Sequence, residues 1–354
     1  MKLWITGASG FLGQYVVAAA LAQGHEVMAV VRPQTNAQRL SWHDHPRVQL
    51  VRLDLRQGRG LEAALAGADA VIHLAAVKSG DFYTQFAGTV LATENLLSAM
   101  AAQGIGQLIA ISTFSVYDYI NIKPWGLLDE SAPLVENPKR RDEYTQTKLI
   151  QERLYREFER DHQAQVTILR PGMIYGRDNL WHSLIGAEIG PSRWLRIGGR
   201  SILPMSYVEN CAEAIALAAS SSAAIGQTLN IVDDELPTQH DYTEMLLRVT
   251  AEPPRLISVS WASLRLLAWL AGQVNHRFCA DQARLPGILV SDKIHARFKP
   301  LRYSNESAKR LLGWVPRYDF SQAVARSCGE SDLLAVAHDP AKSPQRTVVP
   351  LGGG

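Results

Sequence analysis

The stretch TGASGFLG, residues 6–13, decides the fold class of this chain. It follows a short apolar run at residues 3–5 and opens a helical pattern over residues 11–23. Glycines at this spacing let the backbone turn sharply and approach a pyrophosphate, and the helix N-terminus offers free N–H groups and a positive dipole to the phosphates. Because strand, loop and helix occur in this order, the stretch predicts a dinucleotide-binding unit rather than an ordinary turn.

Outward from this loop, short apolar runs alternate with longer helical patterns. Runs rich in Val, Ile and Leu are typical of strands that are buried on both faces of a parallel sheet. The predicted strands are residues 3–5, 27–31, 48–53, 70–74, 108–111, 166–169 and 229–232. The helical patterns cover residues 11–23, 61–65, 84–103 and 144–161. The alternation predicts an α/β protein with a Rossmann-type, doubly wound parallel sheet.

The alternation of strand and helix stops after Gly176, which suggests a division of the chain. Residues 1–177 form the predicted dinucleotide-binding domain, to which residues 204–235 return. Residues 178–203 have no clear pattern, and we expect them to form a smaller, mixed substrate-binding region together with residues 236–330. The composition of residues 337–354, rich in Pro and Gly, predicts a disordered tail.

The composition excludes several classes of protein. A net charge of +2 over 354 residues predicts neither a nucleic-acid nor a membrane partner. Cys211, Cys279 and Cys328 are odd in number and far apart, so we expect reduced thiols, which suit a cytoplasmic location. The beginning of the chain does not read as a signal peptide. The apolar run at residues 261–274 is shorter than the roughly 20 residues that span a bilayer, so we expect a buried or interface helix.

The end of the second predicted strand bears on the choice of dinucleotide. A carboxylate there would bind the ribose 2′-hydroxyl of NAD, whereas an arginine accommodates the 2′-phosphate of NADP. Arg32 and Pro33 occupy this position with no acid beside them. A guanidinium matches the geometry of a phosphate. The sequence therefore favours NADP(H) over NAD(H); a solvent-exposed Arg32 stacked on adenine is the alternative.

A second motif, YTQTK at residues 144–148, begins a helical pattern between the fifth and sixth predicted strands. A spacing of four residues places Tyr144 and Lys148 on one face of a helix. A free tyrosine has a pKa of about 10, and we expect the Lys148 ammonium to lower the pKa of Tyr144. Tyr144 then exchanges a proton with a substrate oxygen while hydride moves at the adjacent carbon.

Three more motifs follow predicted strands: DL at residues 54–55, HLAA at residues 73–76 and RPG at residues 170–172. Together with the G-x-x-G-x-x-G spacing of the loop and the YTQTK motif, they make the chain resemble the extended short-chain dehydrogenase/reductase family. This family includes nucleotide-sugar epimerases, 3β-hydroxysteroid dehydrogenases and dihydroflavonol reductases. The resemblance extends from residue 1 to about residue 330.

The resemblance implies roles for particular residues. Asp54 would contact adenine, the alanine pair would lie along the cofactor, and the RPG segment would line the nicotinamide. Aligned on the Val116-Tyr117 pair, the catalytic hydroxyl of the family falls on Thr113, with Ser112 as the competing residue. We expect His73 to be a structural histidine at a strand end. The complete implied cofactor-binding set is Gly7, Ser9, Gly10, Phe11, Leu12, Gly13, Arg32, Asp54, Leu55, Leu74, Ala75, Ala76, Tyr144, Lys148 and Pro171.

The chain departs from the family pattern at three places. Thr89 stands where the family often has the first Asn of an N-V-x-G-T run, which puts a relay through that Asn in doubt. Phe114 and Ser115 replace the Asp-Glu pair of sugar-nucleotide dehydratases. Met173 replaces an Asn that is common in sugar-nucleotide enzymes. These departures disfavour 4,6-dehydration and weaken the nucleotide-sugar interpretation.

The sequence thus predicts an NAD(P)-dependent oxidoreductase that transfers hydride between the cofactor and a carbonyl or alcohol carbon of a small molecule, with Thr113, Tyr144 and Lys148 as catalytic residues. A nucleotide-sugar epimerase with tightly held NAD and a non-catalytic dinucleotide sensor are the alternatives. No metal site is expected, and residues 43–45 read as a polar loop. The resemblance implies a homodimer that packs through the helices at residues 84–103 and 144–161, and polar support near the substrate cleft from Asn210.

Overall fold

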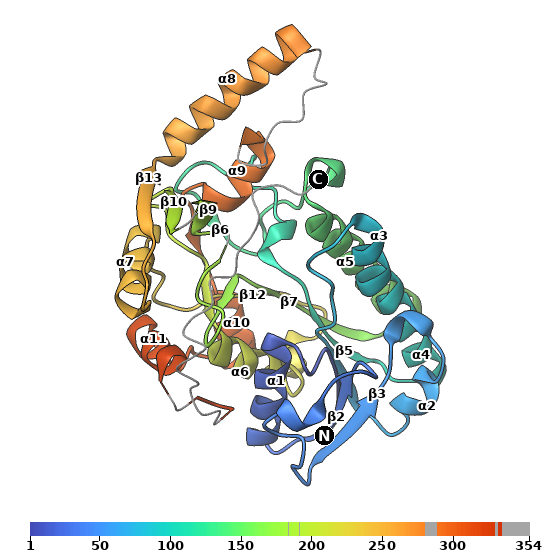
Figure 1. The fold of residues 1–354 in the computed structure, drawn as a ribbon. Helices are drawn as coiled ribbons and strands as arrows, with labels where there is room; N and C mark the ends of the chain where they lie inside the picture. Colours follow the sequence, from blue (N-terminus) through green and yellow to red (C-terminus); the bar gives the residue numbers. More distant parts are fainter. Residues whose placement is uncertain (183, 191, 280–288, 330–331, 335–354) are drawn as a thin grey trace.

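A seven-stranded parallel sheet forms the centre of the molecule in the computed structural model, which describes residues 1–182, 184–190, 192–279, 289–329 and 332–334 (Figure 1). In sheet order, the strands are β12 (Thr228–Ile231), β7 (Gln165–Pro171), β5 (Gln107–Ile111), β4 (Ala70–His73), β1 (Lys2–Thr6), β2 (Glu26–Val31) and β3 (Val48–Arg52). All neighbours in this sheet run parallel. The predicted Rossmann-type α/β fold is therefore confirmed.

Helices cover both faces of the sheet because successive strand residues point to opposite sides. Leu3 and Ile5 of β1 belong to one core cluster, and Trp4 between them belongs to the other. The first cluster is covered by α1 (Phe11–Ala22) and α6 (Val208–Ala218), and the second by α2 (Leu61–Leu65), α4 (Ala92–Gln103) and α5 (Glu143–His162).

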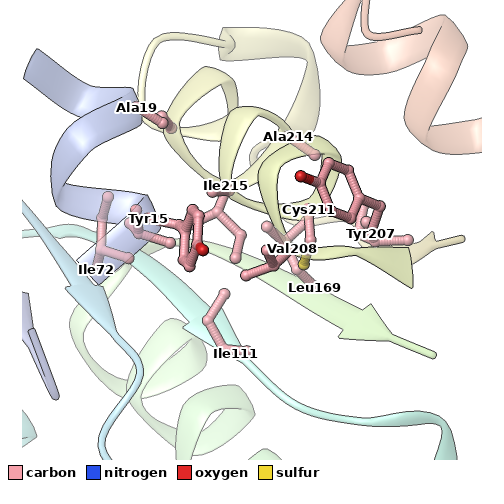
Figure 2. Close-up of a cluster of buried hydrophobic side chains, with 14 of the residues drawn as sticks. Tyr15, Ala19, Ile72, Ile111, Leu169, Tyr207, Val208, Cys211, Ala214 and Ile215 are labelled. Atoms are coloured by element: carbon pink, nitrogen blue, oxygen red, sulfur yellow. The ribbon is translucent and has the colours of Figure 1, made fainter. Parts of the chain in front are cut away.

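The contact between α1 and α6 fixes the helix that follows the glycine loop. Figure 2 shows Tyr15 and Ala19 of α1 facing Cys211 and Ile215 of α6 above the strands. Cys211 is a free thiol whose pKa is raised to about 12 by burial. Cys328 is also free, and the side chain of Cys279 lies outside the described residues.

The predicted helix at residues 84–103 is interrupted in the structure. It consists of α3 (Phe82–Phe86), a π-helical turn (Ala87–Leu91) and α4. Within the turn, the Thr89 hydroxyl accepts a hydrogen bond from the Val77 N–H at 3.0 Å, and the Thr89 carbonyl accepts one from the Thr93 hydroxyl at 2.6 Å. The turn thereby joins this helix to the loop that follows β4.

The prediction that residues 178–203 are irregular is wrong. This segment contains β9 (Gly186–Gly190) and β10 (Arg193–Ile197), which pair antiparallel. The glycines that obscured the pattern allow close approach: a Cβ at Gly186 would lie 1.8 Å from the carbonyl oxygen of Leu195. Trp181 and Trp194 pack edge to face at 4.9 Å between ring centroids. β10 also pairs in parallel with β13 (Arg255–Val259).

The remaining elements complete the C-terminal region. They are β8 (Met173–Tyr175), which pairs with β11 (Met205–Tyr207), β6 (Leu127–Leu128), which pairs with β14 (Arg302–Tyr303), and the helices α7 (Gln239–Val249), α8 (Trp261–Cys279), α9 (Ser291–Phe298), α10 (Glu306–Leu312) and α11 (Phe320–Cys328). The predicted tail, residues 337–354, lies outside the described residues.

Helix α8 projects from the body of the molecule (Figure 1). Leu264 and Ala268 are buried against Ile197, Ile294 and Phe298. The prediction of a buried or interface helix holds for this side alone, since several large apolar side chains of α8 are exposed, among them Leu267 and Phe278. No helix within the described ranges is both long and apolar enough to cross a bilayer.

The C-terminal segment contacts helix α1 through the side chain of Asp332. The Asp332 carboxylate accepts hydrogen bonds from the Tyr15 hydroxyl at 2.8 Å and from Arg177 Nε at 2.7 Å. The side chains of Asp332 and Arg177 are 1% and 8% exposed, so this is a buried ion pair.

Candidate active site

A cavity of about 1120 Å³ lies where the carboxyl ends of the parallel strands meet. Its lining follows β1, β2, β3, β4, β5 and β7 in turn. Ligands of open α/β sheets bind in this place. The residues predicted from the sequence all line this cavity: Gly7, Ser9, Gly10, Phe11, Leu12, Gly13, Arg32, Asp54, Leu55, Leu74, Ala75, Ala76, Thr113, Tyr144, Lys148 and Pro171.

The glycine loop has the shape that a dinucleotide pyrophosphate requires. Gly7 adopts φ +66°, a left-handed conformation that favours glycine. A Cβ at Gly13 would lie 2.1 Å from the carbonyl oxygen of Gly7, so a side chain there would fill the cradle between loop and helix. The loop therefore fits a dinucleotide bound at the N-terminus of α1.

Two arginines lie near Asp54 at the end of the cavity beyond β2 and β3. The Arg56 guanidinium binds Asp54 through three hydrogen bonds, Nε to Oδ1 at 2.9 Å, Nε to Oδ2 at 3.1 Å and Nη2 to Oδ2 at 2.5 Å. This contact holds the pKa of Asp54 below its usual value, with a smaller contribution from the Arg32 charge. Arg32 is exposed at the end of β2. Sequence reasoning missed Arg56, although it stands only two residues after Asp54.

Helix α5 presents Tyr144 in its first turn. Asp142 caps this helix by accepting a hydrogen bond from the Thr145 N–H at 3.0 Å. Burial raises the pKa of Tyr144 to about 12, although a side-chain hydrogen bond with Thr113 works in the opposite direction. The Ser112 hydroxyl, in contrast, has no hydrogen-bond partner in the described part of the chain. Of the two candidate hydroxyls, Thr113 is therefore the one in contact with Tyr144.

Lys148 lies one turn further along α5. Its Nζ donates to the carbonyl oxygen of Ile111 at 2.6 Å and to Gln151 Oε1 at 2.5 Å. Burial lowers the pKa of Lys148 to about 7. The expected lowering of the Tyr144 pKa by this ammonium is wrong for this structure, because burial dominates and the ammonium bonds to Ile111 and Gln151.

The part of the cavity beyond Tyr144 has a mixed lining, in which apolar and aromatic side chains alternate with polar and charged ones such as Asn179, His182, Gln239, Arg297 and Lys299. Its apolar and aromatic lining includes Phe114, Met173, Trp181, Leu203, Phe298 and Tyr303. Lys78, which sequence reasoning missed, is accessible from the cavity, and desolvation by the surrounding protein lowers the pKa of its ammonium. It brings an amino group to this wall, and no ion pair to it is found within the described residues.

The other residues singled out in the sequence, His73, Asn210 and His43, do not line the cavity. His73 is buried, with its pKa lowered to about 3 by desolvation. Asn210 does not line the cavity; it hydrogen-bonds Asp233 and the backbone of Tyr318. His43 pairs with Asp44 at 2.8 Å. Within the described ranges, no group of three His, Cys, Asp or Glu side chains could hold a metal ion.

Comparison with known proteins identifies the family. The model of the NAD dependent epimerase/dehydratase family matches residues 3–231. The chain belongs to this family. It is thus an NAD(P)-dependent enzyme of the extended short-chain dehydrogenase/reductase type, which contains oxidoreductases and epimerases.

Two curated relatives match over almost their whole length. The 4-hydroxy-2-methyl-3-oxo-4-farnesyl-3,4-dihydroquinoline-1-oxide ketoreductase of Stigmatella aurantiaca is 26% identical, with 96% of this chain and 99% of the relative covered. The 2-alkyl-3-oxoalkanoate reductase of Stenotrophomonas maltophilia is 27% identical, with 92% and 98% covered. Among solved structures, UDP-glucuronic acid 4-epimerase from Bacillus cereus in complex with NAD has a TM-score of 0.69 at 21% identity, with 93% and 97% covered, which shows a shared fold.

Proposed function

We propose that this enzyme is a reductase or dehydrogenase that moves hydride between NADP(H) and a carbonyl or alcohol carbon of a small, largely hydrophobic molecule. The observation that carries the proposal is the meeting of Thr113, Tyr144 and Lys148 with the glycine loop in one cavity, whose lining includes the aromatic side chains Phe114, Trp181, Phe298 and Tyr303. The names of the two curated relatives, a ketoreductase and an oxoalkanoate reductase, support carbonyl chemistry.

The geometry divides the work among three side chains. The nicotinamide, when bound, gives or takes the hydride. The Thr113 and Tyr144 hydroxyls hold the substrate oxygen, and Tyr144 donates or accepts its proton. Because the pKa of Tyr144 is raised to about 12, the phenol is protonated at neutral pH, which suits proton donation during carbonyl reduction. Lys148 has three N–H donors and uses two on Ile111 and Gln151, so one remains for a cofactor ribose hydroxyl.

Further proposals concern cofactor, assembly and location. Arg32 and Arg56 support a preference for NADP(H), since guanidinium groups near the adenosine ribose attract a 2′-phosphate. We also propose a homodimer that packs through α4 and α5, and a cytoplasmic location, which the free thiols of Cys211 and Cys328 support.

Nucleotide-sugar epimerisation is the second candidate function, since this chain shares the fold of the Bacillus cereus enzyme. An epimerase oxidises and re-reduces its substrate on one cofactor, so it purifies with cofactor bound and shows no net change in nicotinamide absorbance. A reductase releases its cofactor and shows a net change. Met173, in place of the Asn common in sugar-nucleotide enzymes, favours the reductase.

Tyr144→Phe tests the proposed function. With a panel of hydrophobic ketones and NADPH, the substitution should lower kcat by about 10²–10⁴-fold, because it removes the proton-transfer group. Cofactor affinity should stay nearly unchanged, because the glycine loop holds the phosphates. Tyr155→Phe is the matched control, since Tyr155 is buried on the same helix without lining the cavity. Full activity of Tyr144→Phe would refute the mechanism, and a wild type inert toward ketones and nucleotide sugars would favour a dinucleotide sensor.

A further inference from the structure

A continuous chain of buried hydrogen bonds runs from the end of β1 to Lys148. Thr6 Oγ1 lies 2.8 Å from His73 Nδ1, and His73 Nε2 lies 2.9 Å from Thr93 Oγ1. Gln151 Nε2 donates to the same Thr93 hydroxyl at 2.8 Å, and Gln151 Oε1 accepts from Lys148 Nζ at 2.5 Å. All five side chains are buried.

The partners fix the direction of each hydrogen bond. Thr6 Oγ1 accepts from the Leu74 and Ala75 N–H groups, both at 3.0 Å, so its own proton points to His73 Nδ1. Neutral His73 therefore carries its proton on Nε2 and donates to Thr93. The Thr93 proton goes to the Thr89 carbonyl, which leaves both lone pairs of Thr93 Oγ1 for His73 and Gln151.

This arrangement locks the Gln151 amide in one orientation. If the amide flipped, its NH2 group would face the Lys148 ammonium, and its oxygen would face a Thr93 hydroxyl whose proton is already used. The amide oxygen is thus held toward Nζ. Thr89, which stands where the family often has Asn, contacts the Val77 N–H instead of Lys148.

We propose that Gln151 is a positioning residue for Lys148, and that Thr93 and His73 hold it in place. Gln151 fixes the direction of the ammonium, so that its remaining N–H points into the cavity toward the bound cofactor. This inference deepens the proposed function, because it assigns how the lysine of the Tyr144 and Lys148 pair is oriented in a chain that lacks the family Asn.

Other charged groups near Lys148 set the background for a test. Glu152 on α5 raises the pKa of Lys148 and forms an ion pair with Arg170 at 2.7 Å. The charge of Lys78, in the loop after β4, lowers the pKa of Lys148. His73 is neutral in the relevant pH range, and Tyr144 is protonated. A change made only at Gln151 leaves these groups in place.

The test measures NADPH affinity against pH by quenching of protein fluorescence, which needs no substrate. In the wild type, affinity should fall as pH rises through about 7, because Lys148 loses its proton there. Gln151→Met removes an acceptor from the ammonium, so the midpoint of this fall should move to lower pH by about one unit. Gln151→Glu places a carboxylate beside it and should move the midpoint up by about one unit or more; hydrogen bonds to charged groups are worth this much.

Three further measurements close the test. Gln146→Met, the same change on the same helix at a side chain that bonds the Arg141 carbonyl and does not line the cavity, should leave the midpoint unchanged. Thermal melting checks that each variant folds. If Gln151→Met does not fold, the upward shift expected for Gln151→Glu still tests the proposal. The double variant Thr93→Val with Gln151→Met should have the same midpoint as Gln151→Met alone.

The positioning role of Gln151 would be overturned if the midpoints of Gln151→Met and Gln151→Glu equalled that of the wild type, or if both shifted in the same direction. A flat affinity profile in the wild type would do the same. Failure of the proposed function is separate, because it shows as missing ketone turnover while the affinity profiles remain measurable.

Discussion

Arg32, Arg56 and Asp54 together carry a net positive charge at the end of the cavity that we propose for the adenosine of the cofactor. Arg56 already engages the carboxylate through three hydrogen bonds, so Arg32 is the guanidinium left for a ligand. We therefore expect NADPH to bind more tightly than NADH. Arg32→Ala should reduce this preference about 10–100-fold, the value of a charge-assisted hydrogen bond. Titration calorimetry with both cofactors measures it.

Arg39→Ala is the control for that experiment, since Arg39 is exposed and does not line the cavity. Tighter binding of NADH by the wild type, or an Arg32→Ala variant with an unaltered preference, would contradict the prediction.

At the level of single residues, the sequence was informative where the chemistry depends on spacing within one element. Tyr144 and Lys148 share a helix, and the glycines share a loop, so their relation is visible along the chain. Lys78 and Gln151 were missed because their surroundings depend on packing between elements. Arg56 was missed although its partner Asp54 is only two residues away, because no motif singled it out. The direction of the Tyr144 pKa was also missed, because burial cannot be read from a motif.

Among the elements, the junction of β1, the glycine loop and α1 leaves no room for a side chain at Gly13. At Gly13, a Cβ would meet the Gly7 carbonyl oxygen at 2.1 Å, which is backbone and cannot move aside. Gly13→Ala should therefore weaken dinucleotide binding at least tenfold and lower the melting temperature. Gly106→Ala provides the comparison, since a Cβ there meets nothing within 4 Å and should change neither value. Equal behaviour of the two variants would show that the loop adapts.

Most strands of the central sheet could be predicted because burial on both faces gives them a nearly continuous apolar run, whereas the edge strand β3 is only partly buried and Gln49 interrupts its apolar run. β9 and β10 could not be predicted, because glycines and exposed positions interrupt their pattern, and their pairing involves β13, about 60 residues away in the chain. The π-helical turn was also invisible, since the helical periodicity continues on both sides of it.

At the scale of the whole molecule, the buried Asp332 carboxylate joins segments that are far apart in the chain, because it pairs with Arg177 and accepts a hydrogen bond from Tyr15. Breaking a buried ion pair costs about 3–5 kcal/mol, because it leaves a buried charge uncompensated. Asp332→Ala should lower the free energy of unfolding by this amount in urea denaturation. Asp161→Ala removes the partner of Arg160 from an exposed pair and should leave the free energy of unfolding nearly unchanged. A similar small loss for both would mean that the C-terminal tie contributes little.

The proposed homodimer is a property of the whole molecule as well. We expect light scattering at micromolar concentration to give twice the mass of the 39.0 kDa chain. Arg153 is an exposed residue of α5, and Arg153→Glu should weaken the dimer without altering the cavity, which it does not line. A monomeric wild type would contradict the proposal.

The π-helical turn at Ala87–Leu91 bears on how this chain is compared with others. A hydrogen bond from residue i to residue i+5 encloses one more residue than the regular helical bond. Measured against an unbroken α-helix, the segment therefore contains an insertion of one residue. An alignment without a gap would shift every position on one side of the turn by one residue, or about 100° around the helix axis. Homologous positions of Thr89 and Thr93 should therefore be assigned by superposition of coordinates.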